Sequence, residues 1–104
     1  MISKITIGLA DDHPILRRGM RSVITAEENL DIIWEAHNGQ EVLEKTRTAV
    51  PEVVILDINM PVMDGVETAR HLKADYPQIK IIFLSISPMK NAISPMKNPI
   101  PSRV

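Results

Sequence analysis

Short apolar runs alternate with amphipathic stretches along most of the chain. The apolar runs are rich in β-branched residues and have the length of buried strands, which we expect at residues 4–10, 30–36, 52–57 and 79–84. Between them, apolar residues recur at helical spacing, which predicts helices over residues 14–26, from residue 38 to before Pro51, and from Val66 to near Tyr76. This alternation predicts an α/β domain with a parallel sheet, right-handed crossovers and helices on both faces.

The first predicted helix divides into an apolar face and a basic face. We expect the apolar face to be buried, and it consists of Ile15, Leu16, Gly19, Met20, Val23 and Ile24. We interpret the basic face as solvent-exposed, and it consists of Arg17, Arg18 and Arg21. Trp34, the sole tryptophan, is expected to pack on a face of the sheet.

Acidic residues follow two of the predicted strands. Asp11 and Asp12 come directly after the first strand, and Asp57 ends the third. Because Pro61 cannot extend a strand ladder and Asp64-Gly65 is a strong turn pair, the chain is expected to leave the sheet after Asp57. The carboxyl ends of parallel strands meet at one edge, where open α/β sheets bind their ligands. The sequence therefore predicts three carboxylates lining one crevice.

The candidate residues also have purely structural interpretations. Asp11 and Asp12 suit a cap of the helix that follows them. Asp57 taken alone suits a strand end entering a turn, and Ser85 taken alone suits a hydrogen-bonded loop residue. The histidines show no metal-ligand spacing, so we assign loop or surface positions to His13, His37 and His71. We interpret Met60 and Met63 as packing or turn residues.

Composition narrows the function classes. The chain has 104 residues, a formal net charge of −1 and no cysteine. One domain is the expectation for this length, and the charge gives no electrostatic footprint for nucleic acid. Without cysteine, disulfides and thiolate chemistry are excluded. No apolar segment reaches the length of a membrane span, so the cytoplasm is the expected compartment.

The pattern changes after Ser85. The segment Ile86–Asn91 recurs as Ile93–Asn98, and further prolines follow. Prolines at this frequency exclude a regular helix and a central strand. We therefore predict an incomplete domain over residues 1–85 and an atypical proline-rich tail over residues 86–104.

Several separately placed motifs resemble the receiver domain of two-component response regulators. They are the run Asp11–Pro14, Asp57 with Met60-Pro61 and Asp64-Gly65, and the apolar strand ending at Ser85. The longer run Asp11–Gly19 is similar to the subgroup that carries a LuxR-type helix-turn-helix output domain. The resemblance implies a flavodoxin-like, doubly wound parallel sheet with strand order 2-1-3-4, the fifth strand and last helices being missing or atypical.

The resemblance also implies site roles and partners. Asp57 would take a phosphoryl group from a sensor histidine kinase, and Ser85 would supply the hydroxyl that bonds it in the switch. A Mg²⁺ ion would be held by Asp11, Asp12, Asp57 and the backbone carbonyl of Asn59, Asp11 often acting through water. Such a domain is a phosphoacceptor rather than an enzyme, forms homodimers in some cases, and reaches DNA only through an output domain absent from this chain.

One departure from the family pattern leaves two functions open. A receiver continues past the position of Ser85 to a lysine that contacts the phosphoryl group, but Lys90 and Lys97 both follow Ser-Pro-Met rather than an apolar strand. A parallel crossover before that strand needs a dozen or more residues. The chain is therefore either a phosphoacceptor domain, or a receiver-like interaction module or inactive truncated fragment that cannot complete the switch. A small-molecule enzyme has little support, because no glycine-rich phosphate loop is present.

Overall fold

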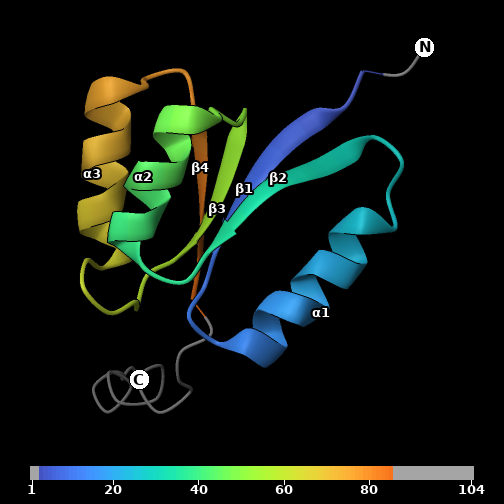
Figure 1. The fold of residues 1–104 in the computed structure, drawn as a ribbon, viewed down its shortest axis with the longest axis horizontal. Coiled ribbons are helices and arrows are strands. Elements are labelled where there is room, and N and C mark those ends of the chain that lie inside the picture. Colours follow the sequence, from blue (N-terminus) through green and yellow to red (C-terminus); the bar gives the residue numbers. More distant parts are fainter. Residues whose placement is uncertain (1–2, 86–104) are drawn as a thin grey trace, which may run out of the picture.

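The computed structural model describes residues 3–85 (Figure 1). Its elements run in the order β1 (Ile5–Ala10), α1 (Pro14–Thr25), β2 (Leu30–Ala36), α2 (Gly39–Thr48), β3 (Val53–Asp57), α3 (Gly65–Asp75) and β4 (Lys80–Leu84). The predicted alternation of strands and helices is confirmed, with ends that differ by a residue or two.

The strands form a parallel sheet in the order β2-β1-β3-β4. Helix α1 covers one face of this sheet, and α2 and α3 lie together on the other face (Figure 1). The fold is the expected flavodoxin-like one. In its register Ala10 pairs with Ala36 of β2 and Leu56 of β3, and Asp57 pairs with Leu84 of β4. The carboxyl ends of all four strands therefore lie at one edge of the sheet.

The core lies between the sheet and helices α2 and α3. Its fully buried side chains include Val54 and Leu56 of β3, Leu72 of α3 and Val42 of α2. Apolar strands are the rule for parallel sheets, and β3 is apolar up to Asp57, with Val54 and Leu56 buried and Val53 and Ile55 partly buried. Central strand β3 therefore holds Asp57 on a rigid support.

Trp34 is buried on a face of the sheet, as predicted, and its indole Nε1 donates a hydrogen bond to the Ala49 carbonyl at 2.9 Å. Gly8 of the neighbouring strand makes room for the ring, because a Cβ at that position would lie 2.4 Å from Trp34 Cζ2. An indole N–H inside a protein needs such a partner, and this bond ties β2 to the end of α2.

The predicted faces of α1 are wrong in part. Ile15 and Val23 are 80% and 71% exposed, and Ile24 is the buried residue of this helix. Arg17, expected in solvent, has only 23% of its side chain exposed because it turns toward Glu35 of β2. An amphipathic pattern shows which side chains are apolar. It does not show which of them other elements cover, and within residues 3–85 Ile15 and Val23 remain uncovered.

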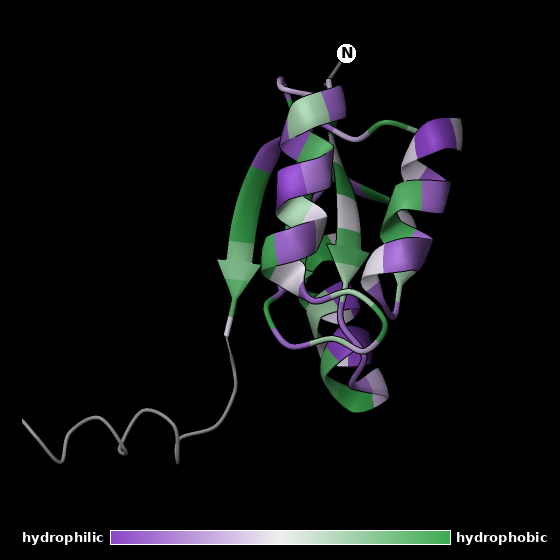
Figure 2. Cartoon of the chain, turned by 90° about the vertical axis from the view of Figure 1, so that its left-hand side faces the viewer, coloured by the Kyte–Doolittle hydropathy of each residue, from purple (hydrophilic) through white to green (hydrophobic). Residues whose placement is uncertain are grey.

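Strand β4 forms one edge of the sheet and is apolar along most of its length (Figure 2). Ile82 and Phe83 of this strand are exposed among residues 3–85. The predictions about the fifth strand, the last helices, Lys90, Lys97 and the tail all concern residues outside the described part.

Candidate functional site

Three carboxylates meet at the carboxyl edge of the sheet, as the sequence predicts. Asp11 and Asp12 follow β1 and Asp57 ends β3, and His13 joins them, with one ligand atom of each within 4.8 Å of the others. Asp11 and Asp57 are buried, whereas Asp12 remains partly open to solvent. The cluster therefore has a buried floor and an open side.

The backbone after β1 fixes Asp11. Its N–H donates to the Ala36 carbonyl at 3.0 Å, and its own carbonyl accepts from Arg17 Nη1 at 2.5 Å. The Asp11 carboxylate accepts the His13 N–H at 2.7 Å. The N-cap of α1 is His13, which makes no side-chain capping bond, so neither Asp11 nor Asp12 caps this helix. The capping interpretation of these aspartates is wrong.

The loop after β3 fixes Asp57. Its Oδ1 accepts the Asn59 N–H at 3.1 Å, and the Gly65 N–H closes the loop on the Ile58 carbonyl at 2.8 Å. Asp64 caps α3 by accepting the Glu67 N–H at 2.9 Å. Gly65, predicted as a turn residue, has no positive φ and is the first residue of α3. A Cβ there would lie 2.3 Å from the Asp57 carbonyl oxygen, so this glycine is needed for close approach to the site.

Val62 carries backbone strain at the tip of the same loop. Its φ of 72° lies in the left-handed region, which a β-branched residue adopts only at a cost, and its side chain is exposed. Met60, two residues earlier, is buried in the core as predicted. The loop therefore combines an anchored start with a strained, exposed tip beside the carboxylates.

His13 is the site residue that sequence reasoning missed. Its Nδ1 lies 3.0 Å from Asp11 Oδ1, 3.2 Å from Asp12 Oδ1 and 3.7 Å from Asp57 Oδ2. The hydrogen bond to Asp11 and, next, the charge of Asp12 raise the pKa of His13 above its ordinary value of 6.5. Its position directly after Asp11-Asp12 was a usable signal, because three consecutive residues at a strand end share one edge.

Three buried carboxylate oxygens have no hydrogen-bond partner among residues 3–85: Asp11 Oδ2, Asp12 Oδ1 and Asp57 Oδ2. Burial is the main cause that raises the pKa of Asp57, and the Asn59 N–H opposes it. A buried charged oxygen that accepts no hydrogen bond destabilises the folded state, and clustered carboxylates also repel one another. A hard divalent cation prefers oxygen ligands such as these, so the donor set fits Mg²⁺.

The remaining predicted residues take different places. The register partner of Asp57 is Leu84, so Ser85 follows at the same edge of the sheet, with its side chain exposed. His37 and His71 lie on the surface as predicted, where they pair with Glu41 at 2.8 Å and Glu67 at 3.3 Å. The structure therefore brings Asp11, Asp12 and Asp57 together and leaves both of these histidines outside the site.

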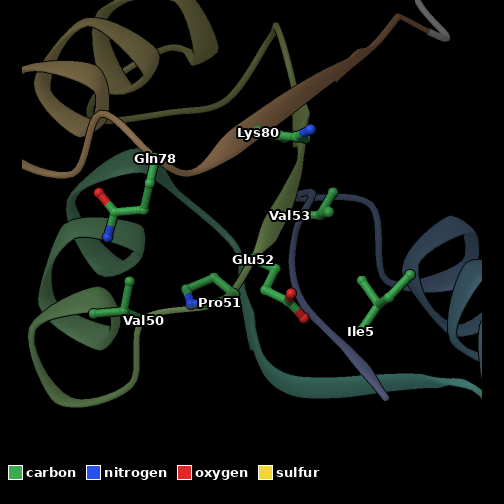
Figure 3. Close-up of a pocket in the computed structure, with 7 residues that line it drawn as sticks. All are labelled: Ile5, Val50, Pro51, Glu52, Val53, Gln78 and Lys80. Atoms are coloured by element: carbon green, nitrogen blue, oxygen red, sulfur yellow. The ribbon is translucent and has the colours of Figure 1, made fainter. Parts of the chain in front are cut away.

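A hollow of about 630 Å³ opens at the opposite edge of the sheet (Figure 3). It is lined by Ile5, Val50, Pro51, Glu52, Val53, Gln78 and Lys80. Glu52 accepts the Thr6 N–H at 3.1 Å through its carboxylate and donates its own N–H to Thr6 Oγ1 at 2.9 Å. Glu52 and Thr6 thus bond each other beside this hollow.

Fold and site together define a class of protein. A doubly wound parallel sheet with buried carboxylates at its carboxyl edge places an acidic cluster where open α/β sheets bind their ligands. Residues 7–97 match the response regulator receiver domain family, and the chain belongs to it. It is a receiver domain of the two-component response regulators.

The relatives of this chain include a transcriptional regulatory protein and a nitrate/nitrite response regulator. The chain is 40% identical over 81 residues to the transcriptional regulatory protein LnrK of Bacillus subtilis, covering 78% of this chain and 37% of LnrK. It is 37% identical over 82 residues to the nitrate/nitrite response regulator NarL of Escherichia coli, covering 79% of this chain and 38% of NarL. The chain thus spans less than half the length of these relatives.

Solved structures show the same fold. A LuxR-family two-component response regulator from Aurantimonas superposes with a TM-score of 0.77 at 27% identity, covering 88% of this chain and 66% of that one.

Among residues 3–85, no helix is long and apolar enough to span a bilayer.

Proposed function

We propose that this receiver domain accepts a phosphoryl group on Asp57 and holds Mg²⁺ with Asp11, Asp12, Asp57 and the carbonyl of Asn59. The observation that carries the proposal is the set of buried oxygens at Asp11, Asp12 and Asp57 that accept no hydrogen bond within residues 3–85. When bound, Mg²⁺ would neutralise the charge of the carboxylates and of the incoming phosphoryl oxygens.

The protein's own residues supply position and a nucleophile. A carboxylate oxygen of Asp57 attacks phosphorus, the bond from phosphorus to the donor nitrogen or oxygen breaks, and the leaving group departs with the electron pair. The Asn59 N–H holds Oδ1 of Asp57, which fixes the rotation of the carboxylate. Burial of Asp57 keeps water from the reacting atoms, and β3 holds the group in place.

Ser85 is the proposed switch residue. It follows Leu84, the register partner of Asp57, and the Ile58 N–H donates to the Leu84 carbonyl at 3.3 Å. Its exposed hydroxyl would donate to a phosphoryl oxygen, and this bond would move the end of β4 between two arrangements.

The proposed partner and setting follow from the family. We infer a sensor histidine kinase as the phosphoryl donor, the phosphohistidine providing the leaving nitrogen. Because LnrK is named a transcriptional regulatory protein and this chain spans 37% of it, we assign contact with DNA to a further domain of such a regulator. The cytoplasm is the proposed compartment, and a homodimer is the proposed assembly of the phosphorylated form.

Intact-mass measurement tests the phosphoacceptor role. The full chain is incubated with Mg²⁺ and acetyl phosphate, and we expect an adduct of one phosphoryl group that hydroxylamine removes, because an acyl phosphate reacts with that nucleophile. Asp57→Asn should abolish the adduct. The matched control is Asp31→Asn, which makes the same change at an exposed position of β2 and should label like the wild type.

The same experiment separates the alternative. A folded, Mg²⁺-saturated wild type that gains no adduct would favour a receiver-like interaction module or inactive fragment. An adduct that persists in Asp57→Asn would move the acceptor to another residue.

A further inference from the structure

We propose that Arg17 is a positioning residue of the acidic site. It holds the main chain of Asp11, so that the carboxylates of Asp11 and Asp12 keep the placement a divalent cation requires. The expected effect of Arg17 on cation binding rests on the proposed function. The contact between Arg17 and Asp11 does not, because it is present without a metal ion.

Arg17 contacts both the site and the neighbouring strand. Its Nη1 donates to the Asp11 carbonyl at 2.5 Å, and its Nε lies 3.3 Å from Glu35 Oε1. Only 23% of the side chain is exposed. A guanidinium carries several donors in one rigid plane, so it can serve both acceptors at once. Arg17 therefore joins α1, the site loop and β2.

The carbonyl of Asp11 is a sensitive point of the site. A peptide unit is planar, so holding this carbonyl also fixes the plane that carries the N–H of Asp12. The amide of Asp11 is held separately by the Ala36 carbonyl at 3.0 Å. With both peptide units of Asp11 fixed, its buried carboxylate and that of Asp12 are set relative to Asp57.

The carboxylates of the site repel one another, and the contact made by Arg17 opposes their separation. Asp11, Asp12 and Asp57 each keep a buried oxygen without a hydrogen bond in one small cluster of residues 3–85, and like charges push such groups apart. The N-cap of α1 provides no side-chain hydrogen bond in compensation. A hydrogen bond from a cation to a carbonyl is among the stronger ones, so Arg17 is well suited to hold this loop.

Arg21 provides a matched control one turn along α1. Its Nη1 donates to Glu35 at 2.9 Å and 3.1 Å, so it shares the carboxylate that pairs with Arg17. Arg17 makes the contact with Asp11, whereas within residues 3–85 Arg21 bonds the Glu35 side chain and not the loop that carries Asp11 and Asp12. Replacing either arginine removes a bridge between α1 and β2, but only Arg17→Ala removes the contact to Asp11.

Two measurements on the full chain test the proposal: amide hydrogen exchange in EDTA and the dissociation constant for Mg²⁺ by calorimetry. In Arg17→Ala we expect the amides of Asp11 and His13 to exchange about tenfold faster or more. We expect Mg²⁺ to bind about 10- to 100-fold more weakly, as for other residues that orient metal ligands. Arg21→Ala should stay within about twofold of the wild type on both measurements.

Arg17→Lys adds a graded variant. An ammonium cannot reproduce the planar fork that serves Asp11 and Glu35 together, so its Mg²⁺ affinity should fall between those of the wild type and Arg17→Ala. If Arg17→Ala does not fold, Arg17→Lys replaces it in the test. Weaker Mg²⁺ binding by Arg17→Lys than by Arg21→Ala would then support the proposal, and equal binding would overturn it.

Equal changes in amide exchange and Mg²⁺ affinity in Arg17→Ala and Arg21→Ala would overturn the proposal. The effect would then come from the loss of an ion pair with Glu35, which both arginines make. Unchanged exchange at Asp11 in Arg17→Ala would overturn it as well. A wild type without Mg²⁺ affinity would refute the cation part of the proposed function, and exchange in EDTA would still decide whether Arg17 holds the loop.

Discussion

The two edges of the sheet differ in how their polar groups are satisfied. At the amino edge, Glu52 and Thr6 exchange hydrogen bonds and the Lys80 N–H donates to the Glu52 carbonyl at 3.0 Å. At the carboxyl edge, three buried carboxylate oxygens lack a hydrogen bond from residues 3–85. A hollow lies at the amino edge, whereas the buried oxygens that accept no hydrogen bond lie at the carboxyl edge.

This difference teaches that a hollow by itself is a poor guide to function here. Polar groups that already bond one another gain little from a ligand. Buried oxygens that accept no hydrogen bond are costly, and a bound ligand can remove that cost. Functional sites commonly carry such destabilising arrangements. The two edges should therefore respond in opposite directions when a carboxylate is removed.

The largest effect is expected from Asp57→Asn, which removes a buried charge. In EDTA near pH 7, we expect its free energy of unfolding to exceed that of the wild type by about 1–3 kcal/mol. The pKa of Asp57 is raised above its ordinary value of 3.8 in the folded state. Wild-type stability is therefore lost as pH rises through that raised pKa, so the advantage of the variant should shrink in acid.

Urea unfolding followed by Trp34 fluorescence provides the measurement, and Asp31→Asn is the control at an exposed site. A metal-free Asp57→Asn variant no more stable than Asp31→Asn would contradict the view that the carboxyl edge is destabilising. Saturating Mg²⁺ should stabilise the wild type more than Asp57→Asn, since a ligand that binds only the folded state adds its binding free energy.

A smaller effect of opposite sign is expected from Glu52→Ala at the amino edge. This change removes the acceptor of the Thr6 N–H, so the free energy of unfolding should fall by about 0.5–1 kcal/mol. Glu52→Gln keeps an acceptor oxygen and should stay close to the wild type. Should Glu52→Ala unfold at the same urea concentration as Glu52→Gln, the amino edge would not depend on this bond.

The smallest effect is expected from His13, whose side chain is 62% exposed. Its pKa is raised above 6.5 in the folded state, so its contribution to stability is fully present below that pH and is lost as pH rises through the raised pKa. In EDTA, wild-type stability should decline over that window, and His13→Gln should lack this component. His71→Gln, outside the site, should retain it, and identical pH profiles for both variants would contradict the role of His13 as partner of the carboxylates.

The order of elements was predictable because the strands are continuous apolar runs and the helices are amphipathic. The faces of α1 were not, since the sequence shows that Ile15 and Val23 are apolar but not that residues 3–85 leave them uncovered. Arg17 illustrates the same limit. A basic residue on a helix is ordinarily solvated, and only the fold places Glu35 and the Asp11 carbonyl within its reach.

The candidate site was predictable to the level of its carboxylates. Asp11, Asp12 and Asp57 follow strands of one parallel sheet, and topology alone brings them to one edge. His13 was missed because a single histidine lacks ligand spacing, and Gly65 was given a turn role because its contact with the Asp57 carbonyl joins elements through space. The roles of Asn59 and Ser85 stay predictions that the proposed experiments address.

The loop between β3 and α3 is closed at its neck and exposed at its tip, where the Met63 N–H bonds the Pro61 carbonyl at 2.7 Å. The Gly65 N–H bonds the Ile58 carbonyl at 2.8 Å, Met60 is buried, and Pro61 and Val62 are exposed. Extra residues inserted between Pro61 and Val62 would cost that one hydrogen bond and a loop-closure entropy that grows only with the logarithm of length. This tip is thus a natural place to graft a reporter peptide beside Asp57 while the carboxylate keeps its support.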